Sequence, residues 1–293
     1  MNGLVLIDKP AGCTSHDIVS RWRKLAGTKR VGHLGTLDPL ATGLLVLMTG
    51  TATRLAQFFE KSQKTYVAEI TFGAVSDTFD ADGQIQETGV SLSSSPKVVC
   101  SALEAFRGRF LQVPPPVSAK KINGVPAYKL ARKHLPVNLK PVEVEITQLE
   151  VESISAKKVV LRITCSAGTY IRSFAHDLGQ RLGCGALLSA LRRIEVGEFA
   201  IENARTLDEL AALAAAGRLS EVVIPGSQLL TQFPAEYFDV CAEARIRQGR
   251  DFRTSPFVIH PGAPFVRALS HSGELIAIGA LKIPNLYHPS TVL

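Results

Sequence analysis

The chain has 293 residues, of which 46% are hydrophobic and 20% charged, and its formal net charge is +7. This composition is typical of a globular protein with a buried core and excludes disordered, collagen-like and coiled-coil proteins. No stretch approaches the roughly 20 apolar residues of a membrane span, the opening MNGLVLIDKPAG lacks the cationic start of a signal peptide, and the five scattered cysteines form no CxxC pair. We therefore expect a soluble, cytoplasmic protein without disulfides or a cysteine zinc site.

Strand and helix signals alternate in the first 63 residues. A strand is predicted over residues 3–8, followed by a helix that is capped at position 14 or 15 and ended by Gly27. Residues 32–43 (GHLGTLDPLATG) predict a loop, because three glycines and an Asp-Pro step disfavour a helix. LLVLMTG then predicts a buried strand or a short buried helix, and a helix is expected over about 51–63.

The middle of the chain is dominated by strands. KTYVAEITFGAV alternates cleanly, so that Tyr66 and Phe72 share one face of a predicted strand and Glu69 lies on the other. SDTFDADG predicts a turn-rich loop, and a helix is expected from Pro96 to about 108. Two further alternating strands are predicted, PVEVEITQLEVESIS and KKVVLRITCSAGTYI. A helix that starts at Ser173 and ends at residue 182 follows them.

The last third of the chain predicts a change of domain. Thr206 and Glu209 form a capping box for an Ala-rich helix. A connector is expected over about 218–236, followed by a short helix (AEARIRQG) and a hairpin in FVRALSHSGELIAIGALK. The order of elements predicts an α+β protein with a mixed, mostly antiparallel central sheet flanked by helices. We expect a main domain over 1–225 and a small β-rich domain over 226–293.

Positive charge is concentrated in one segment of the chain. No acid occurs between Glu104 and Glu143, and this window contributes +8 to a net charge of +7, which leaves −1 for the rest. A field of this kind suits a polyanion such as nucleic acid, although a solvated basic face is the plain alternative. The segment includes the proline-broken VPPPVSAKKINGVPAYK, which disfavours a simple helix. The eight bases are Arg107, Arg109, Lys120, Lys121, Lys129, Arg132, Lys133 and Lys140.

Several kinds of functional site lack their signatures. The sequence contains no GxxxxGK[ST], no GxGxxG, no GxSxG and no HExxH. DTFDADG resembles a calcium loop, but the register that aligns Asp80 and Gly83 leaves Thr78 at the first ligand position and Gly89 where a glutamate is needed. We therefore predict neither a metal nor a cofactor.

Asp38, in GTLDPLATG, has two interpretations. An aspartate in an Asp-Pro step is most often a turn or capping residue. A carboxylate held in a rigid loop of a basic protein can also serve as a nucleophile or base toward an anionic substrate, since it is ionised at neutral pH. The residue alone leaves both interpretations open.

Longer blocks give the chain a family resemblance. GHLGTLDPLATGLL, LIDKPAGCTSHDIV, KTYVAEITFG, DTFDADG and GTYIRSFAHDLGQRLGCGALLSALRR together resemble the TruB family, the bacterial tRNA pseudouridine-55 synthases. The match extends in the same order along about 200 residues. It implies the pseudouridine synthase fold with a C-terminal PUA-like RNA-binding domain, here 226–293, although the start of that tail departs from the family pattern.

The resemblance implies an isomerase and a set of catalytic residues. The reaction breaks the N1–C1′ bond of a uridine in the T-arm loop of tRNA, turns the base and joins C5 to C1′. Asp38 corresponds to the nucleophile, which attacks the ribose or the base, while proton removal at C2′ remains a third role. Tyr66 corresponds to the tyrosine that packs on the target base and moves a proton. Arg172 corresponds to the arginine that pairs with the catalytic carboxylate.

The same resemblance implies substrate-binding residues. Tyr170 precedes Arg172 by two positions, so that in a strand both side chains would face one pocket. Asp80 matches a polar residue of the pocket and Leu191 an apolar residue that lines it. His33 matches a histidine at the position that the flipped nucleotide leaves, and a phosphate contact is expected from Arg54.

These observations lead to one hypothesis and two alternatives. We expect the basic segment 107–140 to be a flap that closes over the T stem-loop, with RNA contacts from Lys120, Lys121 and Arg132. The enzyme would act as a monomer on tRNA, without a cofactor, a membrane or an obligate protein partner. The first alternative is a tRNA-folding chaperone without chemistry. The second is a related synthase in a guide-RNA particle.

Overall fold

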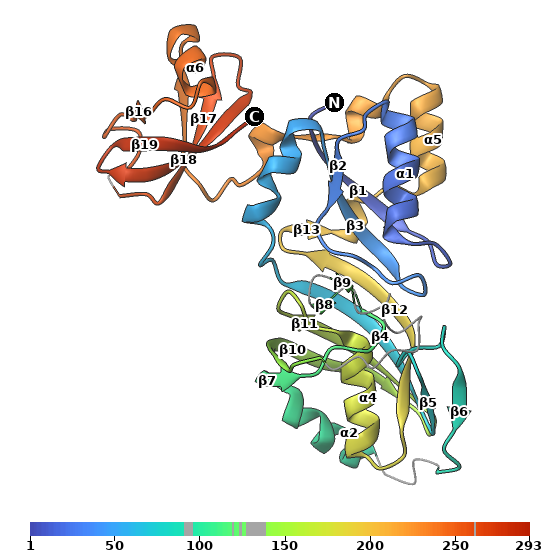
Figure 1. Cartoon of the computed structure of the whole chain (residues 1–293). Helices are drawn as coiled ribbons and strands as arrows, with labels where there is room; N and C mark the ends of the chain where they lie inside the picture. The colour runs from blue at the N-terminus through green and yellow to red at the C-terminus, as the bar shows by residue number, and fades with distance from the viewer. Residues whose placement is uncertain (91–95, 119, 123–124, 127–138, 261) are drawn as a thin grey trace.

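The protein is described by a computed structural model at residues 1–90, 96–118, 120–122, 125–126, 139–260 and 262–293. A large body built on one long sheet carries a small β-rich body at one end (Figure 1). The two chain termini lie near the junction, where Asn2 and Leu293 line the same cavity. None of the helices in these ranges has the length and apolarity to cross a membrane.

The large body is organised by a ten-stranded sheet. Its order is β14-β1-β3-β12-β4-β11-β10-β7, with β2 beside β3 and β13 beside β12, and only β12 and β3 pair in parallel. This confirms the predicted mixed, mostly antiparallel sheet. The strands are β1 (Gly3–Lys9), β2 (Val31–His33), β3 (Thr42–Thr49), β4 (Lys64–Phe72), β7 (Gly108–Gln112), β10 (Val142–Ile154), β11 (Lys158–Cys165), β12 (Ala186–Val196), β13 (Phe199–Ala200) and β14 (Ile224–Pro225).

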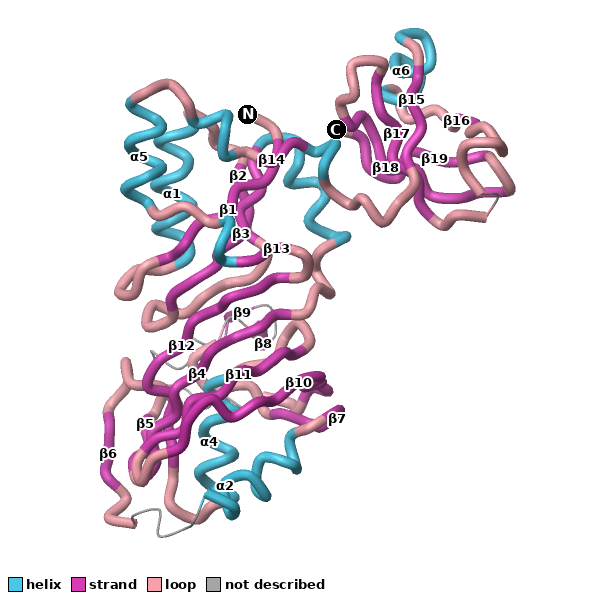
Figure 2. Tube along the Cα trace, turned by 180° about the vertical axis from the view of Figure 1, so that it is seen from behind, coloured by secondary structure: helices cyan, strands magenta, loops and turns pink. Residues whose placement is uncertain are grey.

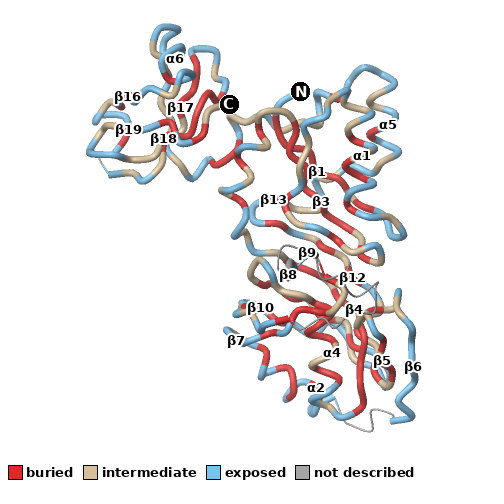
Figure 3. Tube along the Cα trace, in the orientation of Figure 1, coloured by how far each residue is buried: buried red, intermediate tan, exposed pale blue. Residues whose placement is uncertain are grey.

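Helices pack in two pairs at opposite ends of this body (Figures 1 and 2). α1 (Ser15–Ala26) and α5 (Leu207–Ala215) lie beside β1, whereas α2 (Pro96–Leu103) and α4 (Ile171–Arg181) lie near β10 and β7. The predicted caps are present: Thr14 forms a capping box with Asp17, and Gly27 ends α1 with φ 61°. Nearly every residue of β1 and β3 is buried, whereas β4 and β11 largely alternate between buried and more exposed residues, so one face of these two strands is covered (Figure 3).

Three local predictions were wrong in part. Residues 31–33 form β2 and β3 begins at Thr42, so the predicted loop shrinks to 34–41. Of the two alternatives predicted for LLVLMTG, the strand is confirmed. The segment expected to be a helix over 51–63 is a 3-10 helix, Gly50–Phe58. The helix expected from Ser173 begins at Ile171, so Tyr170 and Arg172 do not lie in a strand. Its N-cap, Tyr170, makes no side-chain capping bond, which removes the local signal that would mark the start.

The small body is a five-stranded sheet with one helix. The strands follow the order β15-β17-β18-β19-β16. They are β15 (Ala235–Phe238), β16 (Phe252–Arg253), β17 (Phe265–Ser270), β18 (Leu275–Ile283) and β19 (Leu286–Val292), and the helix is α6 (Val240–Arg247). This agrees with the predicted β-rich C-terminal unit. The predicted boundary at 225/226 stays a prediction, since β14 pairs with β1 and β15 begins ten residues later.

The two bodies share an apolar junction. Phe58 packs edge-on against Phe233 and Phe265, with ring centroids 5.8 and 5.5 Å away. Arg54 Nη1 donates a hydrogen bond of 2.6 Å to the carbonyl of Val292. The buried cluster at this junction includes side chains from both sheets, so burial of apolar surface holds the small body in place.

The start of the basic segment belongs to the sheet. β7, which begins at Gly108, pairs with β10 along its whole length. Only residues beyond Gln112 are therefore left for the proposed flap. Two short antiparallel strand pairs lie outside the two large sheets: β5 (Ala74–Ser76) with β6 (Ile85–Glu87), and β8 (Lys121–Ile122) with β9 (Val125–Pro126).

Candidate active site

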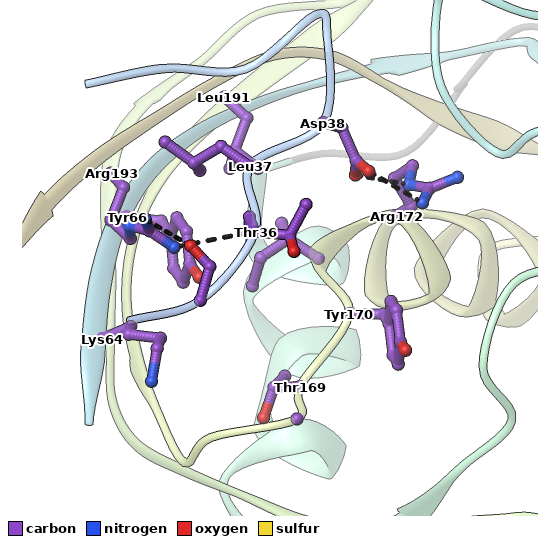
Figure 4. A pocket seen from close by; sticks show the side chains of 13 residues that line it. Thr36, Leu37, Asp38, Lys64, Tyr66, Thr169, Tyr170, Arg172, Leu191 and Arg193 are labelled. Atoms are coloured by element: carbon purple, nitrogen blue, oxygen red, sulfur yellow. Dashed lines mark hydrogen bonds and ion pairs between the residues drawn. The ribbon is translucent and has the colours of Figure 1, made fainter. Parts of the chain in front are cut away.

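A pocket of about 250 Å³ opens where four segments meet. Its walls come from the loop 34–41, the start of β4, the N-terminus of α4 and the middle of β12 (Figure 4). The volume is small beside the pockets that hold drug-sized ligands, so it suits a single base or sugar. The pocket is lined by all three residues that were expected to be catalytic, Asp38, Tyr66 and Arg172.

The loop that carries Asp38 is fixed by buried polar groups. Lys9, with 0% of its surface exposed, donates through Nζ to the carbonyls of Ala41 (2.6 Å), Pro10 (2.9 Å) and Pro39 (3.3 Å). Ser15 Oγ both donates to Leu37 O (2.9 Å) and accepts from Leu37 N (2.8 Å). These contacts hold the residues on both sides of Asp38, so the carboxylate is presented from a rigid turn.

Replacing Lys9 tests the rigidity of this loop. Lys9→Met keeps the aliphatic stem but leaves three carbonyls without their donor, which costs about 1–3 kcal/mol for a buried group. We expect the urea midpoint to fall, and kcat to fall by about 10-fold or more because the Asp38 carboxylate loses its fixed position in the pocket. Unfolding curves and single-turnover rates measure the two effects. Lys61→Met, at an exposed lysine, is the control and should change neither.

Asp38 and Arg172 form the charged end of the pocket. Arg172 Nε lies 2.9 Å from Asp38 Oδ2, and Nη2 donates to Oδ1 at 3.2 Å, as Figure 4 shows. The arginine side chain is 6% exposed and that of Asp38 is 38% exposed. The carboxylate is therefore held by a buried guanidinium and remains open to the pocket, which is the arrangement that a nucleophile or base requires.

A second carboxylate shares the same guanidinium. Asp80 Oδ2 lies 3.4 Å from Arg172 Nε, and Thr78 supplies its carbonyl to Arg172 Nη1 (3.1 Å) and its hydroxyl to Asp80 Oδ1 (2.5 Å). Burial raises the pKa of Asp80, while the Thr78 hydroxyl and the Arg172 charge oppose that rise. Phe79, which lies between Thr78 and Asp80 in the chain, has φ 65°. Its ring stacks on that of His176, with the ring centroids 3.9 Å apart. The DTFDADG turn thus contacts and orients Arg172.

Gln112 fixes the N-terminus of α4 from a distant strand. Its fully buried amide donates to Tyr170 O (3.0 Å) and accepts from Tyr170 N (2.8 Å). Ser173 Oγ donates to Val113 O (2.7 Å), and Arg172 Nη2 donates to Val117 O (2.9 Å). The first turn of α4 is therefore bonded to residues 112–117, which belong to the basic segment. Tyr170 and Arg172 both reach the pocket, but from a helix N-terminus.

Tyr66 and Leu191 form the apolar wall. They lie on neighbouring strands and are 7% and 8% exposed. Burial raises the pKa of the Tyr66 phenol, so its hydroxyl stays protonated at neutral pH. Arg193, opposite Tyr66 in the strand register, is 0% exposed and donates to Leu44 O (2.8 Å) and Gly35 O (3.0 Å). A neutral phenol beside an aliphatic side chain can stack on a base.

Asp177, one turn after Ser173 on α4, provides a test of stability against pH. Burial raises the pKa of its carboxyl from 3.8 to about 6. Because the folded-state value lies above the unfolded one, the stability from this group is present at acid pH and is lost as pH rises from about 4 to about 6. Asp177→Asn should therefore raise the free energy of unfolding by about 1–2 kcal/mol at pH 8. Urea unfolding of wild type and Asp177→Asn at pH 8 and pH 4 measures this difference in the free energy of unfolding. An equal gain at both pH values would contradict the raised pKa of Asp177.

The remaining predicted residues lie outside this pocket. His33 ends β2 with an exposed ring, near the loop that carries Asp38. Arg54 lies at the junction with the small body, where it bonds Val292, and its expected phosphate contact stays a prediction. Lys120 is exposed and Lys121 belongs to β8. Arg132 lies outside the described residues.

Sequence reasoning missed several residues of the site. Gln112, Arg193, Lys64 and Thr36 contact or line the pocket, yet none was expected there. Arg193 could have been found, because it follows Leu191 by two positions on one strand and so faces the same side. Within the described ranges, no group of three or more His, Cys, Asp or Glu residues could hold a metal ion.

The comparisons with known families and sequences agree. The model of "TruB family pseudouridylate synthase (N terminal domain)" matches residues 23–171, and "tRNA pseudouridylate synthase B C-terminal domain" matches 172–231. A tRNA pseudouridine synthase B from Solibacter usitatus is 48% identical over 293 residues, which is 100% of both chains. The enzyme of that name from Geobacter sulfurreducens is 41% identical over 85% of this chain and 82% of its own.

Solved structures support the fold. A chain from "Crystal Structure of a Cbf5-Nop10-Gar1 Complex" has a TM-score of 0.69 and 26% identity, covering 97% of this chain and 79% of that one. A chain from "Structure of H/ACA RNP bound to a substrate RNA containing 2′-deoxyuridine" has a TM-score of 0.70 at 23% identity, over 99% and 84%. The latter likeness concerns the fold alone. Together with the full-length sequence match, these results show that the chain is an isomerase that belongs to the TruB family of tRNA pseudouridine synthases.

Proposed function

We propose that the enzyme converts uridine 55 in the T loop of tRNA to pseudouridine, with Asp38 as the catalytic carboxylate on a flipped-out nucleotide. The observation that carries this proposal is the Asp38–Arg172 pair at 2.9 Å on the wall of a base-sized pocket. A protein that only binds or folds tRNA has no use for an open carboxylate held by a buried arginine. The chemistry-free chaperone is therefore the weaker candidate.

The side chains of the pocket support a division of roles. The N1–C1′ bond breaks, the uracil turns, C5 bonds to C1′, and the proton on C5 is released while N1 regains one. Asp38 either bonds C1′ or the base during this exchange or removes a proton at C2′. The neutral Tyr66 phenol stacks on the uracil and is available to move a proton. Leu191 opposes the base from the neighbouring strand.

The target nucleotide must leave its stack before it can reach Asp38. Extrusion costs a few kcal/mol, which phosphate contacts and new stacking in the pocket offset. The apolar wall of Tyr66 and Leu191 supplies the stacking surface. We propose that the basic segment after Gln112 supplies phosphate contacts and that the PUA-like body adds others. The enzyme would work as a monomer in the cytoplasm, where tRNA is processed.

The basic segment gives a prediction about salt. Neutralising Lys120, Lys121, Arg132 and Lys133 together should weaken tRNA binding, because each phosphate contact contributes through counterion release. The slope of log Kd against log salt should fall in magnitude by about 0.7–0.9 for each contact that is lost. Filter binding between about 50 and 200 mM salt measures it. Unchanged affinity and slope would mean that this segment does not contact RNA.

The modified position and the activity are tested with two tRNA transcripts that differ only at position 55. A tRNA transcript labelled with tritium at C5 of uridine should release label on incubation with the enzyme, because C5 loses its hydrogen when it bonds C1′. The matched transcript with cytidine at position 55 should release none. Release that is equal from both RNAs would overturn the proposed position, and no release from either would overturn the proposed activity on this RNA.

A further inference from the structure

The pocket has a second charged end, made of two cations. Lys64, at the start of β4, and Arg193, on β12, line the wall that lies away from the Asp38–Arg172 pair (Figure 4). The two side chains meet at Gly35: a Cβ built there would lie 3.2 Å from Lys64 Cε and 3.5 Å from Arg193 Nη1. Gly35 has φ 109°, so both the backbone and the space favour glycine at this point.

Neither cation has a carboxylate partner. Within the part of the chain that the structure describes, the ion pairs include neither Lys64 nor Arg193. Arg193 is fully buried and is held by backbone carbonyls. Lys64 is half-buried, and its Nζ donates once, to Ser62 O at 2.8 Å. An ammonium has three donors, so two remain available.

This arrangement is unfavourable without an anion. Burial lowers the pKa of Lys64, and the Arg193 charge lowers it further. Two like charges in a partly desolvated site repel each other, and the cost is recovered when an anion binds between them or beside the accessible one. At the other end of the pocket, Asp38 and Arg172 line the wall and the buried Asp80 lies behind them on the same guanidinium. Because two carboxylates face one cation there, an anionic group is directed to the Lys64 end.

The substrate brings an anion of the right kind. An extruded nucleotide enters with a phosphate on each side, while its base needs the apolar wall of Tyr66 and Leu191 between the two charged ends. We propose that Lys64 binds one of the two phosphates that flank the extruded uridine, with the buried Arg193 strengthening the local positive potential. This inference rests on the proposed function of the same pocket, and it assigns Lys64 a binding role, not a chemical one.

The first test separates charge from packing. Lys64→Met keeps the stem and removes the charge, Lys64→Arg restores the charge, and Lys61→Met is the matched control at an exposed lysine three residues earlier. For Lys64→Met we expect the KM for a T-arm stem-loop to rise by about 5–10-fold, with kcat within about threefold. Lys64→Arg and Lys61→Met should stay near wild type. A fall in kcat with unchanged KM would overturn the proposal.

The second test identifies the phosphate. Stem-loops are prepared with a neutral methylphosphonate immediately 5′ or immediately 3′ of the target uridine. One of the two should bind wild type about 5–10-fold more weakly than the native stem-loop, whereas Lys64→Met should bind both with nearly the same affinity. Equal losses for wild type and Lys64→Met at both positions would overturn the phosphate contact. If the native stem-loop is not converted by wild type, the proposed function fails instead.

Discussion

Asp38→Asn should abolish isomerisation and leave tRNA binding intact. The substitution keeps the shape of the side chain but removes the negative charge of the carboxylate that we propose as the nucleophile or base, so we expect kcat to fall by about 10⁴-fold or more. Binding should stay equal or tighten slightly, because the site loses a negative charge that faces a polyanion. Tritium release and filter binding, measured on the same tRNA transcript, report the two quantities.

The controls for this variant follow from the geometry. Asp38 is 38% exposed, and Arg172 still contacts Asp80 when Asp38 is neutral, so the fold should be preserved. Asp208→Asn, an exposed aspartate on α5, changes the net charge equally and should retain full activity. If Asp38→Asn kept its activity, the carboxylate would have no chemical role. If wild type bound tRNA but released no tritium from any transcript, the result would favour the alternative of a tRNA-folding chaperone without chemistry.

Local signals were sufficient to predict the elements that depend on neighbouring residues. The capping box of Thr14 with Asp17 involves contacts three residues apart, and so does that of Thr206 with Glu209. The alternation in β4 places Tyr66 and Phe72 on one buried face, as predicted. Such features are visible in sequence because the partners are a fixed few positions apart.

Features that depend on distant partners were not predictable in the same way. α4 starts at Ile171 because the amide of Gln112, 58 residues earlier, bonds the backbone of Tyr170. Lys9 ends β1, directly after Asp8, and its burial is explained only by its three carbonyl acceptors, two of which, Pro39 and Ala41, lie about 30 residues away. Arg54 bonds a carbonyl 238 residues away. No pattern within one element encodes these contacts.

The Asp38–Arg172 pair was predictable in one respect and not in another. Each residue occurs in a distinctive block, so the resemblance could name them, but nothing in their spacing of 134 residues indicates contact. The structure adds Asp80 as a second partner of the same guanidinium. One cation therefore balances two carboxylates, of which Asp38 is partly exposed and Asp80 is buried.

That balance leads to a strong effect at Arg172. Arg172→Met leaves Asp80, which is 4% exposed, without its cation, and breaking a buried ion pair in this way costs about 3–5 kcal/mol. Activity should be lost as well, since Asp38 loses both contacts that orient it. Arg172→Lys keeps the charge but cannot reproduce the fork of contacts, so its stability should be near wild type while kcat falls by about 100-fold.

The stability deficit of Arg172→Met should depend on pH in a direction that burial dictates. Burial already raises the pKa of Asp80, and removing Arg172 takes away one of the groups that oppose this rise. The folded-state pKa then lies further above the unfolded one, so the stability associated with Asp80 is present at acid pH and is lost as pH rises through the folded value. Urea unfolding should therefore show a larger deficit at pH 8 than at pH 5. The double variant Arg172→Met/Asp80→Asn lacks the buried carboxyl and keeps only the partly exposed Asp38. Its deficit should therefore depend less on pH than that of the single variant. An equal deficit at both pH values in the single variant would mean that the Asp80 pKa does not depend on the Arg172 charge.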